Sequence, residues 1–110
     1  MSAEQRVCEL VITAPDAEWA EKITRDLIDR KLIACGHQFQ IQAIYTWQGK
    51  TEANTETRVA LHTRVDLVDE ISAIVTAAHP YQVPCVVALP IISASPSYAD
   101  WIITTTTSLS

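Results

Sequence analysis

The pattern of apolar and polar positions changes period along the chain. Residues 7–13, VCELVIT, are mostly aliphatic or β-branched, which favours a strand. From Trp19 onward, apolar side chains recur at helical spacing. Asp16 is suited to cap the start of this helix, which we expect to end near Lys31. The chain therefore opens with a strand and an amphipathic helix.

Two strands joined by a short polar link follow this helix. Residues 38–47 and 52–63 both favour strand, and Gly49 between them can take the positive φ of a tight turn. The pattern predicts a long hairpin. In its second arm, alternation places Val59, Leu61 and Thr63 on one face, and the other face carries Glu56, Arg58, Ala60 and His62.

Helical spacing returns after the hairpin and ends at HPYQVP. Thr63 and Asp66 have the spacing of a capping box, with Asp in place of the usual Glu. Pro80 cannot continue a helix, and it pushes His79 out of the helical region. We therefore interpret HPYQVP first as the end of a helix and the start of a strand.

One strand and one short helix complete the chain. Residues 85–92 favour an apolar strand. Because Pro90 has no N–H to donate, we expect its end of the strand to lie at a sheet edge or a bulge. Ser95 as cap and Pro96 at the first helical position begin a last helix. We expect its inward face to carry Tyr98, Trp101 and Ile102, and the tail TTTTSLS to fray.

The order of elements is βαββαβ plus a C-terminal helix. It predicts an α+β, ferredoxin-like fold in which two helices cover one face of an antiparallel sheet. We expect a single domain over residues 1–110.

The predicted hairpin is longer than the helices that would cover it. A helix of about 15 residues spans roughly 22 Å, whereas a ten-residue strand spans roughly 33 Å. The far end carries Ile44, Tyr45 and Trp47. Exposed apolar surface of this kind indicates self-association through the hairpin and the sheet edges. The alternative is a hairpin that curls over its own core.

Composition narrows the classes of function. Of 110 residues 48% are apolar and 19% charged, which excludes a disordered chain. No apolar run approaches the roughly 20 residues of a membrane span, and the polar start MSAEQRVCELV has no signal-peptide core. The net charge is −5 and the basic residues are scattered, which argues against nucleic acid. Three distant cysteines without a CxxC motif indicate free thiols in a reducing compartment, so we expect a cytoplasmic protein.

Four segments together resemble the CutA divalent-cation tolerance family. They are TAPD, KLIAC, IYTWQGK with Glu56 following, and HPYQVP leading to ALPI and YADW, and they cover nearly the whole chain in order. The resemblance implies a ferredoxin-like subunit similar in fold to the PII regulatory proteins. It also implies a homotrimer built through the long hairpin, and a role in tolerance to copper and other divalent metals. We expect no enzymatic activity.

The chain departs from the family at the positions to which metal binding is assigned. Ile12 stands where the resemblance implies Cys, and Ala78 replaces the first of two paired histidines, leaving only His79. Cys8 shares a strand face with Ile12 but lies roughly 13 Å away. His62 replaces the usual Lys, and Cys85 replaces a typical Glu.

Two residues are candidate metal ligands. His79 suits Cu(II) or Zn(II), and the alternative is a helix-end histidine that complements the helix dipole. Cys35 is a candidate ligand for Cu(I), against a buried and inert thiol. His37 shares a face with Cys35 if the segment is extended, which gives a Cys/His pair.

Other candidates concern contacts between subunits. Glu56 and His62 share a strand face but lie roughly 20 Å apart, so they can meet only across an interface. Tyr81 either lines an intersubunit cleft or packs at the helix–strand junction. Tyr45 and Trp47 are expected in the trimer interface.

The leading hypothesis is a trimeric CutA-like protein of divalent-metal response, with copper or another divalent metal bound at intersubunit clefts. A PII-like module that binds a nucleotide or small anion is the second, although the chain has only Gly36 and Gly49 and no glycine-rich phosphate loop. A structural scaffold with an indirect metal phenotype is the third. No Ser/His/Asp or Cys/His spacing points to an enzyme.

Overall fold

The structure is a computed structural model that describes residues 6–106. Its elements in chain order are β1 Val7–Ala14, α1 Ala17–Asp29, β2 Cys35–Trp47, β3 Lys50–Arg64, the 3₁₀ turn η2 Val65–Leu67, α2 Val68–Ala78, β4 Val86–Pro90 and α3 Pro96–Thr105.

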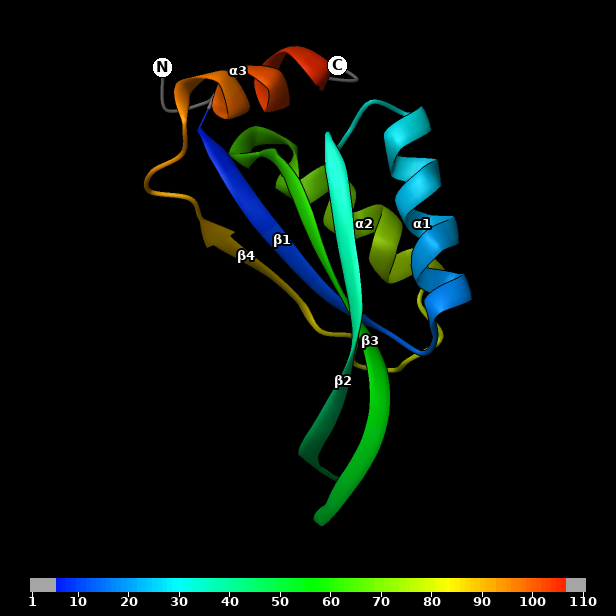
Figure 1. Ribbon diagram of the computed structural model, residues 1–110. Coiled ribbons are helices and arrows are strands. Elements are labelled where there is room, and N and C mark those ends of the chain that lie inside the picture. The colour runs from blue at the N-terminus through cyan, green and yellow to red at the C-terminus, as the bar shows by residue number, and fades with distance from the viewer. Residues whose placement is uncertain (1–5, 107–110) are drawn as a thin grey trace.

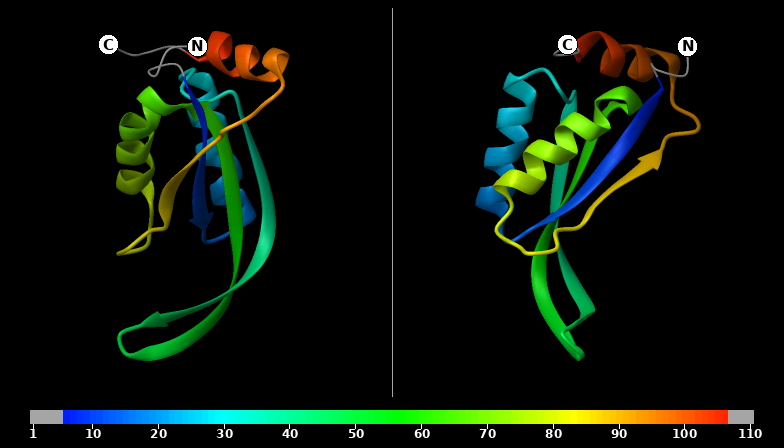
Figure 2. Two further views of the ribbon diagram at one scale, coloured as in Figure 1. Left: turned by 90° about the vertical axis from the view of Figure 1, so that its left-hand side faces the viewer. Right: turned by 180° about the vertical axis from the view of Figure 1, so that it is seen from behind.

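The strands form one antiparallel sheet in the order β2-β3-β1-β4. Helices α1 and α2 lie side by side on one face, and α3 lies across one end of the sheet (Figures 1 and 2). This arrangement confirms the predicted ferredoxin-like fold. The other face of the sheet, which we call the open face, is not covered by α1 or α2.

The main core fills the space between the sheet and the two long helices. Side chains from all these elements are fully buried there, among them Leu10, Ile12, Leu27, Leu61, Ile71 and Val75. A smaller cluster beneath α3 holds Val7, Ala34 and Ile102. Burial of this apolar surface, at about 25 cal/mol per Å², is the main favourable term in folding.

Helix α1 begins as the sequence predicts. The Asp16 carboxylate accepts a hydrogen bond from the backbone N–H of Trp19 at 2.8 Å, which satisfies one donor of the first turn. The helix ends at Asp29, two residues before the expected position, and Lys31 takes a positive φ of 60° as the chain turns toward β2.

The predicted cap of α2 is wrong. Thr63 lies inside β3 with its side chain in the core, where its hydroxyl donates to the carbonyl of Leu32 at 2.5 Å. Asp66 instead pairs with Arg64 at 2.9 Å. The helix follows the 3₁₀ turn and has no side-chain cap. Because β3 runs to Arg64, Thr63 belongs to the strand, and its side chain lies in the core, where it cannot cap the helix.

The last helix lies where the sequence predicts it, but not all of its predicted inward-facing residues are buried. Pro96 occupies its first turn, and the Ser95 side chain makes no capping hydrogen bond. Ile102 is buried and Tyr98 is half-buried, but Trp101 is 43% exposed, so the inward prediction for Trp101 is wrong. Because α3 covers only the end of the sheet, a narrower strip of this helix is buried than the sequence pattern suggests.

The hairpin of β2 and β3 extends well beyond the helices, as predicted (Figure 1). Its ladder runs from Cys35 opposite His62 to Trp47 opposite Lys50. The far half of the hairpin bends beneath the body (Figure 2). The alternative prediction of a hairpin that curls back is therefore also partly correct. The far half nevertheless stays open to solvent, and Ile44 is 74% exposed.

Candidate functional site

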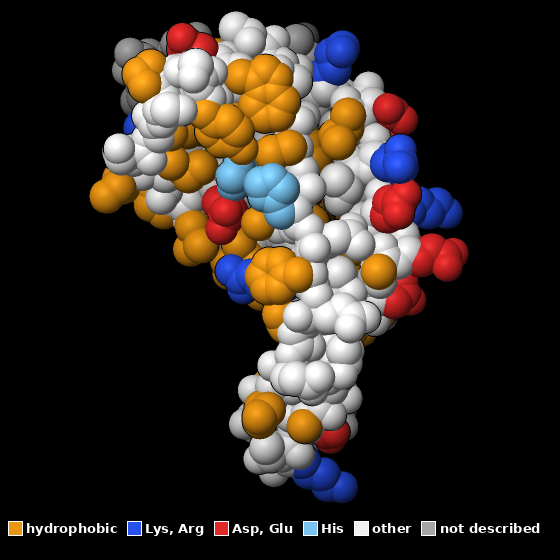
Figure 3. Space-filling view, in the orientation of Figure 1, with side chains coloured by type: hydrophobic (Ala, Val, Ile, Leu, Met, Phe, Trp, Pro, Cys, Tyr) orange, Lys and Arg blue, Asp and Glu red, His pale blue; other side chains and the backbone are white. Residues whose placement is uncertain are grey.

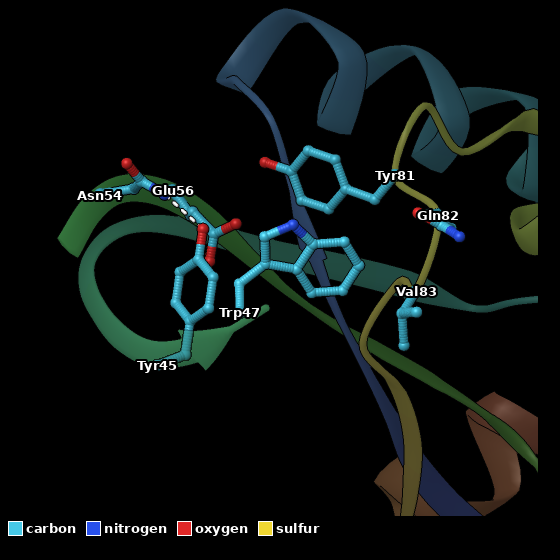
Figure 4. A pocket seen from close by; sticks show the side chains of 7 residues that line it. All are labelled: Tyr45, Trp47, Asn54, Glu56, Tyr81, Gln82 and Val83. Carbon is cyan, nitrogen blue, oxygen red and sulfur yellow. Dashed lines mark hydrogen bonds between the residues drawn. The ribbon is translucent and has the colours of Figure 1, made fainter. Parts of the chain in front are cut away.

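A pocket of about 310 Å³ lies where the bent hairpin approaches the loop after α2 (Figure 4). Both strands of the hairpin and the HPYQVP loop contribute its lining, which consists of Tyr45, Trp47, Asn54, Glu56, Tyr81, Gln82 and Val83. Four of these residues, Tyr45, Trp47, Glu56 and Tyr81, are predicted site or interface residues from the sequence.

The pocket is built around one carboxylate. Glu56 is only 8% exposed, and the rings of Tyr45, Trp47 and Tyr81 surround it (Figure 4). Burial, followed by the neighbouring Glu56 carboxylate, raises the pKa of Tyr81 to about 12. Tyr81 therefore stays a neutral phenol at physiological pH. A carboxylate among aromatic faces is an environment that favours a cation.

The amide of Asn54 completes one wall of the pocket. Its nitrogen donates a hydrogen bond to the hydroxyl of Tyr45 across the two strands of the hairpin. Tyr45 lies opposite Glu52, so this is a diagonal cross-strand pair. The contact holds the Tyr45 ring beside the Glu56 carboxylate.

His79 anchors the loop that carries Tyr81. Its Nε2 donates to the carbonyl oxygen of Thr13 at 2.7 Å, and its Nδ1 accepts from the backbone N–H of Tyr81 at 3.1 Å. The ring lies between Trp19 and Tyr81, with centroid separations of 4.8 and 4.7 Å. These partners require the neutral ring with its proton on Nε2.

The hydrogen bonds of His79 bear on both of its predicted roles. In this conformation, both ring nitrogens are engaged, so neither offers a lone pair to a metal. A neutral ring also does not complement a helix dipole by charge. Binding of a metal by His79 stays a prediction, and it requires the ring to leave these partners.

A second group of polar side chains lies on the open face near α3. We call it the His62 cluster, and it consists of Glu9, Cys35, His37, His62 and Tyr98. Histidine side chains at the surface of this face are bordered by apolar groups (Figure 3). His62 Nε2 lies 2.9 Å from a Glu9 oxygen, and His62 Nδ1 lies 2.5 Å from the Tyr98 hydroxyl.

Cys35 links the rest of the cluster. Its sulfur lies 3.3 Å from the Tyr98 hydroxyl and 4.0 Å from Nε2 of His37. Burial, followed by a hydrogen bond with Cys35, raises the pKa of Tyr98 to about 12. The predicted pairing of Cys35 with His37 on one strand face is confirmed by this contact.

Gly36 fixes the strand that presents this pair. A Cβ at Gly36 would stand 2.7 Å from a methyl carbon of Thr24 on α1, and 3.0 Å from Leu61. The backbone of β2 therefore passes directly beneath α1. Because side chains alternate along a strand, Cys35 and His37 both point to the opposite, open face.

The structure separates residues that the sequence hypothesis groups together. Glu56 lines the pocket and His62 belongs to the other cluster, so the two do not meet within one chain, as predicted. Sequence reasoning missed Glu9 and Tyr98. Glu9 is the one acidic residue of VCELVIT, which was a usable signal, but its partner depends on the strand register.

Within residues 6–106, no three His, Cys, Asp or Glu side chains lie close enough together to hold a metal ion. Ile12 is fully buried in the core, and Ala78 is exposed at the end of α2. Cys8 is also in the core, where burial raises its pKa to about 11. All three cysteines are free thiols. At any one place the described residues therefore supply fewer donors than the three or four that a firm metal site needs.

Comparison with known proteins decides the family. The family model described as CutA1 divalent ion tolerance protein matches residues 8–105. The chain belongs to this family. The divalent-cation tolerance protein CutA of Archaeoglobus fulgidus is 40% identical over 93 residues, covering 84% of this chain and 91% of that protein. Protein CutA of Homo sapiens is 34% identical over 100 residues, covering 90% of this chain and 56% of the human protein.

Solved CutA structures agree with the fold. The periplasmic divalent cation tolerance protein CutA of A. fulgidus superposes with a TM-score of 0.88 at 38% identity, covering 90% of this chain and 97% of that chain. CutA1 of Oryza sativa gives a TM-score of 0.90 at 31% identity, covering 96% and 98%. Among residues 6–106 no helix is long and apolar enough to cross a membrane.

Proposed function

We propose that this CutA family member is a non-enzymatic homotrimer that acts in tolerance and response to divalent metal ions, copper among them. Its ligand sites lie in clefts between subunits, and the Glu56 pocket is the part of the cleft that one chain supplies. The observation that carries this proposal is a buried carboxylate on a hairpin that extends beyond its own helices.

Self-association is supported by the apolar groups left on the surface. Phe39, Val87 and Leu89 of the open face are 53%, 48% and 44% exposed, and Ile44 near the hairpin tip is 74% exposed. Strands β2 and β4 are both edges of the sheet. Apolar groups gathered on a face and unpaired strand edges are features that oligomers cover.

Binding of a divalent ion in the cleft needs ligands from two subunits. The pocket supplies one carboxylate, and a firm metal site needs three or four ligands. A neighbouring hairpin brings further carboxylate, amide or imidazole groups. The trimer and the metal site are therefore linked in this proposal, since residues 6–106 of an isolated chain offer an incomplete set of ligands.

The test combines light scattering with titration of Cu(II) and Zn(II). We expect the wild-type protein to be a trimer. We expect Glu56→Gln to weaken metal binding about tenfold or more without dissociating the trimer. Glu18→Gln, an exposed carboxylate on α1 outside the hairpin and the pocket lining, is the matched control and keeps its affinity. A monomer, or equal binding by wild type and Glu56→Gln, contradicts the proposal.

A structural scaffold with an indirect metal phenotype is the second candidate. It is favoured by the lack of a three-ligand cluster within one chain over residues 6–106. An intact trimer that binds neither metals nor nucleotides in a thermal-shift screen would support it. Binding of a nucleotide would instead support the PII-like module. We also propose a cytoplasmic location, which the three free cysteines support. Cell fractionation tests this proposal.

A further inference from the structure

The Glu56 pocket is larger than a single bound ion requires. Its volume of about 310 Å³ lies at the lower end of the range of about 300–1,000 Å³ that small-molecule sites occupy. Its walls come from the bent hairpin and from the loop after α2 of the same chain (Figure 4). A neighbouring subunit that packs on the outside of the hairpin would therefore leave these walls in place. The size and the single-chain walls favour a small organic molecule.

The charge around the pocket favours a cation. Of the described residues that line it, only Glu56 carries a charge, and this residue is buried. Burial is the main cause of the raised pKa of Tyr81, and the carboxylates of Glu56 and Asp16 add to it. Negative charge therefore acts on the Tyr81 hydroxyl from the hairpin and from the start of α1. An anionic ligand would be repelled here, whereas a cation would be attracted.

Three aromatic rings surround the carboxylate. Tyr45 and Trp47 lie two residues apart on β2, so alternation places both on the side of the ribbon that carries Glu56. The ring of Tyr81 approaches from the loop after α2 (Figure 4). The faces of such rings carry partial negative charge and attract alkylated ammonium groups. The pocket thus combines a charge partner for the nitrogen with apolar contact surface for its methyl groups.

The pocket offers few side-chain acceptors for a primary ammonium group, which has three N–H donors. Glu56 is the only carboxylate among the described lining residues. The Asn54 nitrogen is engaged with the Tyr45 hydroxyl, and the Asn54 oxygen points away from the rings (Figure 4). N–H groups left without partners are costly once water is removed. Methyl groups in their place need no acceptor and can pack on the rings.

We propose that the Glu56 pocket binds a small tertiary or quaternary ammonium compound, with its methyl groups on Tyr45, Trp47 and Tyr81 and its charge paired with Glu56. This inference rests on the proposed function in taking the pocket as a ligand site that stays open within the cleft. A metal ion would leave the rings unused, whereas an organic cation uses both the rings and the carboxylate. Both kinds of cation need Glu56, so they exclude each other.

The test is an NMR titration of the full-length chain in amine-free phosphate buffer near neutral pH. Three ligands share the same alcohol portion. Choline ends in a trimethylammonium group, ethanolamine in a primary ammonium group, and 3,3-dimethylbutan-1-ol in an uncharged tert-butyl group. We expect choline to shift the indole N–H signal of Trp47 saturably, and the other two ligands to bind at least about tenfold more weakly. Trp47→Leu identifies the signal, and the comparison of ligands needs only the wild-type protein.

Variants separate the contribution of the charge from that of the rings. Glu56→Gln keeps the shape of the side chain and should weaken choline binding about tenfold. Tyr81→Leu should also weaken it about tenfold, and Tyr81→Phe, which restores the ring, should recover most of the affinity. Glu18→Gln changes an exposed carboxylate on α1 outside the pocket lining, and it should leave the affinity unchanged.

Three results overturn the proposal. One is the lack of a saturable shift with choline, as expected if a side chain of a neighbouring subunit fills the pocket. Another is equal affinity for choline and the uncharged alcohol, which would mean that the pocket selects apolar shape and not charge. The third is equal affinity for choline and ethanolamine, or equal choline binding by wild type and Tyr81→Leu. Either form of the third result would mean that the rings do not select the ligand.

Light scattering and metal titration on the same samples separate this proposal from the proposed function. A trimer that binds Cu(II) or Zn(II) through Glu56 but does not bind choline would overturn only the ammonium site. Choline binding with the expected order of ligands, in a protein that is a monomer or binds no metal, would overturn only the proposed function.

Discussion

His62 and Glu9 stand directly opposite each other on the β1–β3 ladder, and the imidazole Nε2 lies 2.9 Å from a carboxylate oxygen. The pair lies on the open face of the sheet, and the two side chains are 13% and 31% exposed. A carboxylate at this point fixes which nitrogen of His62 carries the proton. The other nitrogen, Nδ1, is then the atom through which His62 contacts the Tyr98 hydroxyl.

Removal of the Tyr98 hydroxyl should destabilise the fold modestly. Tyr98→Phe leaves Nδ1 of His62 and the Cys35 thiol without their shared partner, and we expect a loss of about 1 kcal/mol in the free energy of unfolding. Urea denaturation measures this loss. Tyr45→Phe is the control, because its partner Asn54 is solvent-exposed, and we expect less than about 0.5 kcal/mol there. Equal losses in the two variants would contradict the role of the cluster.

Replacement of His79 should be costly. His79→Ala leaves the carbonyl of Thr13 and the N–H of Tyr81 without their partners in a largely buried site, and we expect a loss of about 2–3 kcal/mol. Thermal and urea denaturation provide the measurement. His37→Ala, at an exposed position, should change stability by less than about 0.5 kcal/mol. If His79→Ala is as stable as wild type, the ring does not hold this loop.

A side chain at Gly36 should push α1 away from the sheet. We expect Gly36→Ala to cost about 1–3 kcal/mol, because its methyl group would overlap the Thr24 methyl. Thr24→Ser removes that methyl and keeps the hydroxyl that donates to Ala20. The double variant should therefore recover part of the loss, as measured by urea denaturation. No recovery would mean that the contact with Leu61 dominates.

Stability should fall in alkali through two tyrosines. The pKa values of Tyr81 and Tyr98 are about 12 in the folded chain, against about 10 when unfolded. Below pH 10 both states keep these protons. Between about pH 10 and 12 the unfolded chain releases its protons first, so the free energy of unfolding falls as pH rises. Urea denaturation across this range should show a shallower fall in the Tyr81→Phe/Tyr98→Phe double variant. An equally steep fall in the free energy of unfolding in both proteins would mean that other groups cause it.

The three thiols should react in a fixed order. Cys85 is exposed, Cys35 is half-buried, and Cys8 is buried with a pKa raised to about 11. Since the thiolate is the reactive form, a chromogenic disulfide reagent at pH 8 should modify Cys85 first and Cys35 second. Cys8 should react only after denaturant is added. Rapid reaction of all three thiols in the native protein would contradict the burial of Cys8.

The sequence predicts the fold because its signals are local. Alternation in the second hairpin arm and the helical spacing after Trp19 each need only neighbouring residues, and both are confirmed. The cap at Asp16 is correct for the same reason. The cap at Thr63 failed because a longer strand takes this residue into the core, and sequence alone did not show where the strand ends.

The candidate sites were only partly predictable. Cys35 and His37 share a face by simple alternation, so the sequence contains this pair. Glu9 joins His62 only through the register of β1 against β3, and Tyr98 arrives on a helix that packs from the other end of the chain. Such contacts depend on tertiary placement, which no local pattern encodes.

The turn at the hairpin tip controls a pocket that it does not line. Gln48 and Gly49 both have positive φ, and they join the strands by the shortest link that suits their twist. The ladder continues without a break from the body to this link, so alternation keeps Tyr45 and Trp47 on the side of the ribbon that carries Glu56. A longer, more flexible link would leave that alternation intact but would let the strand ends separate, and the two aromatic side chains would then spend less time beside the carboxylate.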